Sequence, residues 1–215
     1  MTLLLEAWTF ILEHPARFGQ ALLTHVTLSA AALFTAAALA IPLGVLIADY
    51  RRSALLAINA ANIGRTLPSL AVLALVMPVL GTGFVPSWFA LTLLAIPPIL
   101  INTCTAVREV DADVVDAARG MGMTGGEIIR KIKLPLALPV LFAGVRTAAV
   151  QVVSGAVLAA YIGGGGLGDF ITAGVAMMAV PQLLVGAIPA TLLSLGTDFL
   201  FGSIQRWLTP TGLRT

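Results

Sequence analysis

The chain has 215 residues, of which 59% are hydrophobic and only 10% are charged, and its formal net charge is +2. A soluble domain usually carries about 25% charged residues, so this composition excludes a water-soluble globule of ordinary surface polarity. The basic residues do not gather in one patch, which favours membrane topology over a nucleic-acid partner. The single cysteine, Cys104, excludes an internal disulfide. We therefore predict an all-α, polytopic membrane protein in which 1–215 forms a single transmembrane domain.

The apolar runs of the sequence predict five spans, because a membrane helix needs about 20 apolar residues. Segment 2–14 is apolar but too short to span, and we expect an amphipathic helix at the outer surface there. The uncharged run Thr66–Val107 is too long for one span and is divided at the Gly/Pro cluster 81–86. The predicted spans lie at about 21–48, 64–80, 87–107, 137–160 and 183–204. Five prolines fall inside these runs, where neighbouring helices can satisfy the freed backbone groups: Pro42, Pro68, Pro78, Pro97 and Pro98.

The placement of Lys and Arg predicts the orientation of these spans. With five spans, the basic residues of the connections 49–65 and 108–136 and of the C-terminal tail fall on one side, whereas the other side holds only Arg17. Connections rich in Lys and Arg face the cytoplasm. We therefore expect a multi-pass protein of the cell (cytoplasmic or inner) membrane, with its N-terminus outside and its C-terminus in the cytoplasm.

The connection 108–136 is the longest polar stretch, with five acidic and five basic residues. Asp111 can cap a short helix that runs to about Arg119 and ends at Gly120 and Gly122. Segment 124–127, Thr-Gly-Gly-Glu, reads as a capping box for a second helix, which we expect to end before Pro135. A solvated connector is the plain interpretation of such a loop.

The loop also carries a specific motif. Asp116-Ala117-Ala118 is followed by three residues, Gly122, nine residues and 132–135, Ile-Lys-Leu-Pro. This pattern resembles the loop that defines permeases of binding-protein-dependent ABC importers, Glu-Ala-Ala-x3-Gly-x9-Ile-x-Leu-Pro, with Asp in place of Glu. The resemblance implies the fold of a type I ABC importer permease. It also implies that an ATPase subunit docks on a coupling helix, with both small alanines set closely in its groove. The implied docking residues are Asp116, Ala117, Ala118, Gly122, Ile132, Leu134 and Pro135.

A glycine-rich loop follows the fourth predicted span. It contains Gly163, Gly164, Gly165, Gly166 and Gly168. A phosphate-binding loop would continue with Gly-Lys-Ser/Thr, which is missing, so we expect no ATP hydrolysis by this chain. Two interpretations stay open: a flexible outer loop, and a tight or re-entrant turn at an outer gate, where glycines permit close backbone packing.

Four further stretches narrow the resemblance to the osmoprotectant branch of these importers, the glycine betaine/carnitine/choline permeases. They are Arg65–Ala71 (Arg-Thr-Leu-Pro-Ser-Leu-Ala), Ala143–Ala148, Ile162–Gly168 and the tail Leu208–Leu213. The methionine importer permease, of similar size, is the alternative. The resemblance implies alternating access, with an ATPase dimer that carries ATP and Mg, a second permease that is identical or related, and an extracytoplasmic substrate-binding protein. That binding protein would hold the aromatic cage for the quaternary ammonium group.

Three charged residues within the predicted spans are candidates for function by default: Arg65, Arg146 and Asp198. We place Arg65 near the cytoplasmic start of the second span. The other interpretation of all three is snorkelling or an internal ion pair, and an Arg146–Asp198 pair is a specific hypothesis. His14 and His25 lack metal-ligand spacing, so no metal site is predicted. A secondary transporter, an intramembrane enzyme and a passive channel are disfavoured, because the sequence shows one docking loop and neither an internal repeat nor a nucleophile–base pair.

Overall fold

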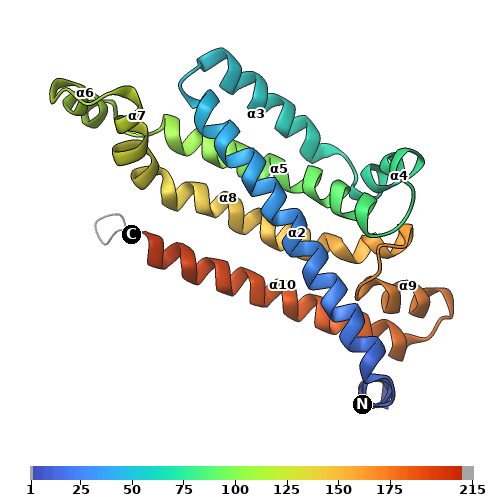
Figure 1. Cartoon of the computed structure of the whole chain (residues 1–215). Coiled ribbons are helices and arrows are strands. Elements are labelled where there is room, and N and C mark those ends of the chain that lie inside the picture. Colours follow the sequence, from blue (N-terminus) through green and yellow to red (C-terminus); the bar gives the residue numbers. More distant parts are fainter. Residues whose placement is uncertain (1, 210–215) are drawn as a thin grey trace.

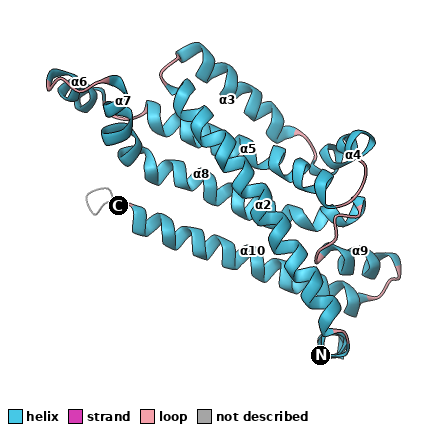
Figure 2. Ribbon diagram, viewed as in Figure 1, coloured by secondary structure: helices cyan, strands magenta, loops and turns pink. Residues whose placement is uncertain are grey.

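The computed structural model describes residues 2–209, and every regular element in that range is helical (Figures 1 and 2). The elements in chain order are α1 (Thr2–Glu13), α2 (Pro15–Ala48), α3 (Arg51–Thr66), α4 (Ser69–Leu80), α5 (Phe84–Arg108), α6 (Ala112–Gly120), α7 (Gly125–Ile128), the π-helical turn η1 (Ile129–Lys133), α8 (Leu134–Gly155), the 3-10 segment η2 (Ala156–Ile162), α9 (Gly168–Ala176) and α10 (Val180–Leu208).

Within residues 2–209, four helical runs are long and apolar enough to cross a membrane: α2, α5, the continuous run Gly125–Ile162, and α10. Helices α2 and α5 run in the same direction, because the Trp88 indole donates to Thr35 while Gly44 lies against Thr103. The chain must therefore return between them, and the bent pair of α3 and α4 makes that passage. This confirms the predicted all-α, polytopic class.

The remaining passages alternate in direction. Helix α8 runs antiparallel to α5, since Gly144 packs on Asn102 and Gly155 lies beside Leu91. Helix α10 runs antiparallel to α8, since Asp198 pairs with Arg146 (2.7 Å) and Gln205, seven residues later, donates to the Pro139 carbonyl, seven residues earlier (3.1 Å). With α3 and α4 taken together as one, the described part of the chain makes five passages along the bundle. The start of α3, α6, α7 and the end of α10 therefore lie at one end of the molecule, here called the α6 end, and α1, α4 and α9 lie at the other, the α1 end (Figure 1).

The second passage differs from the expected span 64–80. It is already helical from Arg51, and it bends by 95° at Leu67-Pro68, where both residues are extended (ψ 128° and 129°). A residue before proline disfavours the helical conformation, and Pro68 lacks the N–H that would continue the helix. The prolines at 42, 78, 97 and 98 do lie inside helices, as expected.

Because of this bend, Arg65 lies at a different depth along the bundle from the one predicted. A Cβ on its neighbour Gly64 would lie 3.7 Å from Pro97, near the midpoint of α5. At about 1.5 Å per residue, Arg65 lies roughly 20 Å along α3 from Arg51 at the α6 end. The prediction that Arg65 lies near the start of its span is wrong; this side chain sits halfway along the bundle.

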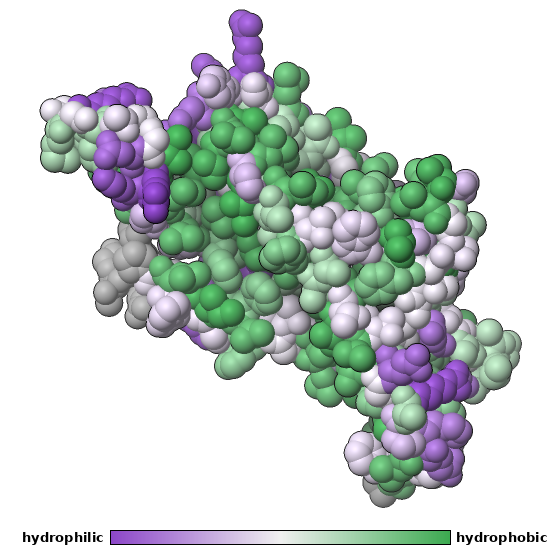
Figure 3. All heavy atoms as spheres, viewed as in Figure 1, coloured by the Kyte–Doolittle hydropathy of each residue, from purple (hydrophilic) through white to green (hydrophobic). Residues whose placement is uncertain are grey.

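Helix α5 is the centre of the core, and α2 packs on it through small residues. Ala32, Ala36 and Ala40 are each at most 1% exposed, and a Cβ on Gly44 would lie only 2.8 Å from Thr103. Small residues at four-residue intervals allow helix backbones to approach closely in membrane bundles. In the space-filling view an apolar band separates polar surface over α6 and α7 from polar surface at the α1 end (Figure 3).

Helix α1 corresponds to the amphipathic helix expected at 2–14. Its buried residue Ala7 packs with Phe170 of α9 and Val185 of α10. Leu5 and Trp8 on its other faces are each 60% exposed. This helix is therefore tied to the α1 end of the bundle by one face and presents a large apolar surface outward.

Candidate functional site

The first half of the motif loop folds as the capping pattern predicts. The Asp111 carboxylate accepts from the backbone N–H of Asp113 (2.9 Å) and caps α6. At the other end, the N–H of Gly122 donates to the Arg119 carbonyl and that of Met123 to the Ala118 carbonyl. This is a Schellman motif, which needs a left-handed residue after the helix, and Gly122 has φ +85°. The motif glycine is therefore explained by backbone conformation.

The capping box of α7 is also formed. Thr124 Oγ1 accepts from the Glu127 N–H (3.4 Å), and Glu127 Oε2 accepts from the Thr124 N–H (3.0 Å). Lys131 Nζ donates to the same carboxylate (2.9 Å) and, with the Thr124 bonds, lowers the pKa of Glu127 to about 2. The cap is thus fully charged at neutral pH.

The prediction that this second helix ends before Pro135 is wrong. Helix α7 continues through the π turn η1 into α8, giving one helical run, Gly125–Ile162. The Leu134 N–H donates to the Ile129 carbonyl, five residues back, so the turn contains one extra residue. Pro135 then falls in the first turn of α8, where its missing N–H costs least. The loop is consequently continuous with the fourth passage.

The two alanines of the motif have different surroundings. Ala118 is 1% exposed and packs with Val115 and Ile128, so it holds α6 against α7. Ala117 is exposed, and Asp116 is exposed beside Arg119 (3.0 Å). The expectation that both alanines enter a partner's groove is therefore not met, because only Ala117 is accessible. Of the remaining motif residues, Ile132 and Leu134 are partly buried and Pro135 is exposed.

An exposed apolar face on α6 was not predicted. Val114 is 41% exposed and Met121 is 74% exposed, and Ala117 lies between them at three- and four-residue spacing. Residues at this spacing are neighbours on one helix face. Because charged residues dominate the rest of the loop, Val114, Ala117 and Met121 form a distinct surface, here called the α6 contact face.

An ion pair that sequence reasoning missed ties the loop to the first passage. Lys133 Nζ donates to the Asp49 carboxylate at the C-terminal end of α2. The Lys133 side chain is only 11% exposed. The two residues are 84 positions apart, so no local pattern in the sequence could have indicated the contact.

The glycine-rich loop is a tight, packed turn and not a flexible one. Gly163 and Gly166 have φ of +73° and +94°. A Cβ on Gly164 would meet Ser87 Oγ at 2.2 Å, and one on Gly168 would meet the Val157 carbonyl at 2.1 Å. The N–H of Gly83 donates to the Ile162 carbonyl (2.7 Å), which joins this turn to the 81–83 turn. Glycine is needed here for close approach; a gate at this turn stays a prediction.

His25 connects α2 to this end of α8. Its Nε2 lies 2.9 Å from the Val153 carbonyl, its side chain is 1% exposed, and a Cβ on Gly166 would lie 3.3 Å from its Nδ1. The α2 helix therefore reaches from the Lys133 contact at the α6 end to the glycine turn at the α1 end.

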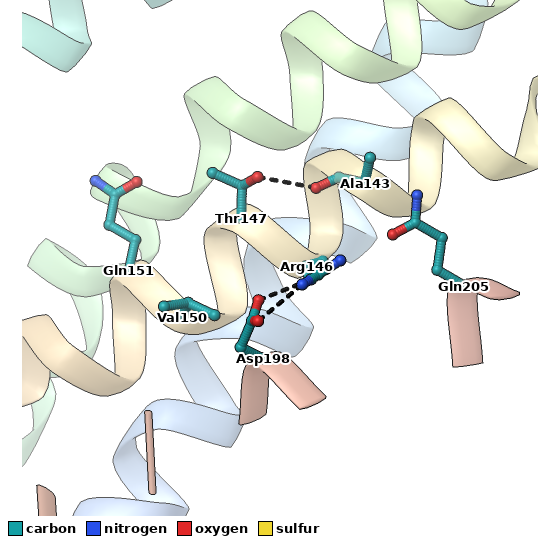
Figure 4. Close-up of a pocket in the computed structure, with 7 residues that line it drawn as sticks. All are labelled: Ala143, Arg146, Thr147, Val150, Gln151, Asp198 and Gln205. Carbon is teal, nitrogen blue, oxygen red and sulfur yellow. Dashed lines mark hydrogen bonds and ion pairs between the residues drawn. The ribbon is translucent and has the colours of Figure 1, made fainter. Parts of the chain in front are cut away.

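The hypothesised Arg146–Asp198 pair is present. Arg146 Nε and Nη2 donate to the two Asp198 carboxylate oxygens, each at 2.7 Å, in a bidentate geometry (Figure 4). The pair lies at the side of an open cavity of about 580 Å³, lined also by Thr147, Gln151 and Gln205. Arg65 is exposed and makes no ion pair within residues 2–209. The same range contains no group of three or more potential metal ligands.

An all-helical bundle of five passages, with a capped motif loop continuous with one of them, defines a membrane permease. Residues 40–211 match the family described as "Binding-protein-dependent transport system inner membrane component". The chain belongs to this family, and it is a multi-pass permease of a binding-protein-dependent transport system. The resemblance seen in the motif loop is thereby confirmed.

The curated relatives cover nearly the whole chain. The choline transport system permease protein OpuBB of Bacillus subtilis is 40% identical over 190 residues, 88% of each chain. The glycine betaine/carnitine/choline transport system permease protein OpuCD of the same organism is 35% identical, over 98% of this chain and 92% of its own. The osmoprotectant import permease protein OsmW of Salmonella typhimurium is 34% identical, over 95% and 98%. The names of these three relatives describe permeases for choline, for glycine betaine, carnitine and choline, and for osmoprotectants.

Solved structures share the fold. The inward-facing MetNI methionine ABC transporter contains a chain with a TM-score of 0.77 and 22% identity, with coverage of 92% of this chain and 99% of that one. An amino acid ABC transporter with histidines gives a TM-score of 0.71 and 19% identity, over 92% and 97%. These matches confirm the type I ABC importer permease fold.

Proposed function

We propose that this chain is the permease subunit of an ATP-driven importer of small quaternary ammonium osmoprotectants, of the choline, glycine betaine and carnitine type. The relatives named for these solutes support the substrate class, since they match at 34–41% identity over most of both chains. The observation that carries the proposal is the motif loop from Asp116 to Pro135, folded as a capped helix pair that continues directly into a membrane passage.

The loop is the docking element for a separate ATPase dimer, which holds ATP and Mg. Its contact with the ATPase is made through the α6 contact face, because Ala118 and Ile128 are already occupied inside the loop. Movement of the ATPase reaches the membrane by two routes: the unbroken helix from α7 into α8, and the Lys133–Asp49 pair at the end of α2. This chain holds no nucleotide or other cofactor.

The α6 end faces the cytoplasm, and the N-terminus lies outside. The basic residues Arg51, Arg52, Arg108 and Arg130 all fall at the α6 end, which agrees with the rule that cytoplasmic connections are rich in Lys and Arg. A second permease, identical or related, completes the pathway, and a loaded binding protein docks at the α1 end. Closure of the ATPase dimer opens the pathway outward, and hydrolysis returns it inward.

The proposal is tested by uptake of radiolabelled glycine betaine and choline into cells that lack their own uptake systems. The chain is co-expressed with its ATPase, binding protein and any second permease. We expect ATP-dependent uptake that competes with unlabelled quaternary ammonium solutes and not with methionine. Uptake of methionine without uptake of either solute would contradict the substrate class and favour the alternative.

A further inference from the structure

One face of α8 is polar, whereas α2 and α10 expose large apolar side chains. Thr147, Gln151 and Ser154 are exposed on it, and Arg146 is half-exposed. Their spacing places them within about 140° of one another around the helix, on the side opposite the buried residues Ala148 and Val152.

The contrast with the neighbouring passages is clear. On α2, Phe34 is 76% exposed and Leu39 is 56% exposed. On α10, Leu192 is 63% exposed and Phe199 is 72% exposed. Apolar exposed faces of this kind suit lipid, whereas polar side chains within a membrane face the bundle interior, a partner or a water-filled cavity.

The polar face of α8 (Arg146, Thr147, Gln151 and Ser154) lies deep in the bundle. The helical run from α8 through η2 covers 134–162, and Gln151 falls near its middle. Because α8 and α10 are antiparallel and Arg146 pairs with Asp198, Gln151 is level with Leu192. Both positions therefore lie within the hydrocarbon thickness that about 20 helical residues span.

The hydrogen bonds of this face leave one polar side chain without a protein partner in the described part of the chain. Thr147 and Ser154 donate to carbonyls of their own helix, at 2.9 and 2.8 Å. The Gln151 side-chain amide has no hydrogen-bond partner within residues 2–209. An amide without partners is costly in hydrocarbon, so it requires water or a polar solute. The stick view shows Thr147 and Gln151 on the same helix as Arg146, along the cavity (Figure 4).

We propose that the polar face of α8, together with Asp198, forms the wall of the water-filled pathway and contacts the transported solute. This inference rests on the proposed importer function and goes further by naming the wall. Since Arg146 and Asp198 neutralise each other through two hydrogen bonds, the wall presents hydrogen-bonding groups without a free charge. Such a wall suits a small quaternary ammonium solute that bears a hydroxyl or carboxylate. Gln151 and Thr147 can form hydrogen bonds with that group, and without an ion pair these bonds hold the solute only weakly. The cavity of about 580 Å³ is large enough for such a solute.

The test is thiol accessibility in the complete transporter, reconstituted with its ATPase, its second permease and its binding protein. Cys104 is buried and is replaced first (Cys104→Ala). Gln151→Cys and Thr147→Cys are then compared with Leu192→Cys, an exposed residue at the same depth on the apolar face of α10. The probe is a membrane-impermeant thiosulfonate that carries a trimethylammonium group, applied in nucleotide-free and ATP-bound states, with and without saturating glycine betaine.

We expect Gln151→Cys to react at least tenfold faster than Leu192→Cys in one of the two states, and glycine betaine to slow that reaction severalfold. Equally slow labelling of Gln151→Cys, Thr147→Cys and Leu192→Cys in both states would overturn the inference, because the face would then meet lipid or a dry protein interface. Fast labelling of Gln151→Cys that glycine betaine does not slow would support a water-filled wall but overturn its contact with the solute, whereas the solute class itself is decided by the uptake experiment.

Discussion

Lys133 and Asp49 form an ion pair that joins the motif loop to the C-terminal end of α2, and the Lys133 side chain is nearly buried in it. Helix α2 then runs without interruption to the opposite end, where His25 contacts the Val153 carbonyl and Gly166. One continuous helix thus connects the motif loop with the glycine-rich turn.

The first prediction concerns this pair. We expect Lys133→Met to lower solute transport roughly fivefold per ATP hydrolysed, since losing a partly screened pair worth about 1 kcal/mol loosens the link between loop and helix. The measurement is the ratio of transport to hydrolysis in proteoliposomes. The exchanged pair, Lys133→Asp with Asp49→Lys, should restore part of the ratio. An unchanged ratio in Lys133→Met would show that force does not pass through this contact.

The second prediction concerns the α6 contact face. A charge at Met121 would be desolvated against the ATPase, so we expect Met121→Glu to reduce co-purification of the ATPase by at least tenfold. Met178→Glu is the control, because Met178 is 92% exposed at the opposite end. Equal recovery of the ATPase with both variants would remove Met121 from the docking surface.

The third prediction compares two loop glycines to separate the effect of backbone conformation from the effect of room for a Cβ atom. A Cβ on either Gly120 or Gly122 would meet no atom within 4 Å, but only Gly122 has a left-handed φ. We expect Gly122→Ala to destabilise the loop by about 1 kcal/mol. Gly120→Ala, by contrast, should be neutral or slightly stabilising. Hydrogen exchange at α6 amides measures both. Identical protection in the two variants would contradict a conformational role for Gly122.

The fourth prediction concerns Arg146 and Asp198. Removing one partner leaves an uncompensated charge inside the membrane. We therefore expect Arg146→Gln and Asp198→Asn each to lower the melting temperature of the purified complex, because each variant loses both hydrogen bonds of the bidentate pair. The charge exchange should recover part of the loss. If the exchange recovers nothing, the pair does not stabilise the complex through its charges.

Local patterns carried most of what the sequence could predict. Asp111 and Thr124 cap helices because capping depends on residues only two or three positions away. The loop motif lies within 20 residues of sequence. The similar depth of Arg146 and Asp198 followed from their positions within the predicted spans. The bend at Pro68 did not follow, because prolines at 42, 97 and 98 look the same in the sequence and remain helical. Tertiary packing decides that Ala118 is buried against α7. It also decides that Lys133 pairs with Asp49. No local sequence pattern encodes either contact.

The central claim is that this permease moves quaternary ammonium solutes with force received at its motif loop. The most direct test is ATP-driven uptake of glycine betaine in proteoliposomes that hold the complete transporter, with Met121→Glu and Met121→Leu compared side by side. We predict uptake with the unmodified chain and with Met121→Leu, which keeps the contact face apolar, and loss of uptake with Met121→Glu. Uptake that persists undiminished in Met121→Glu, or no uptake of any quaternary ammonium solute by the unmodified transporter, would contradict the account.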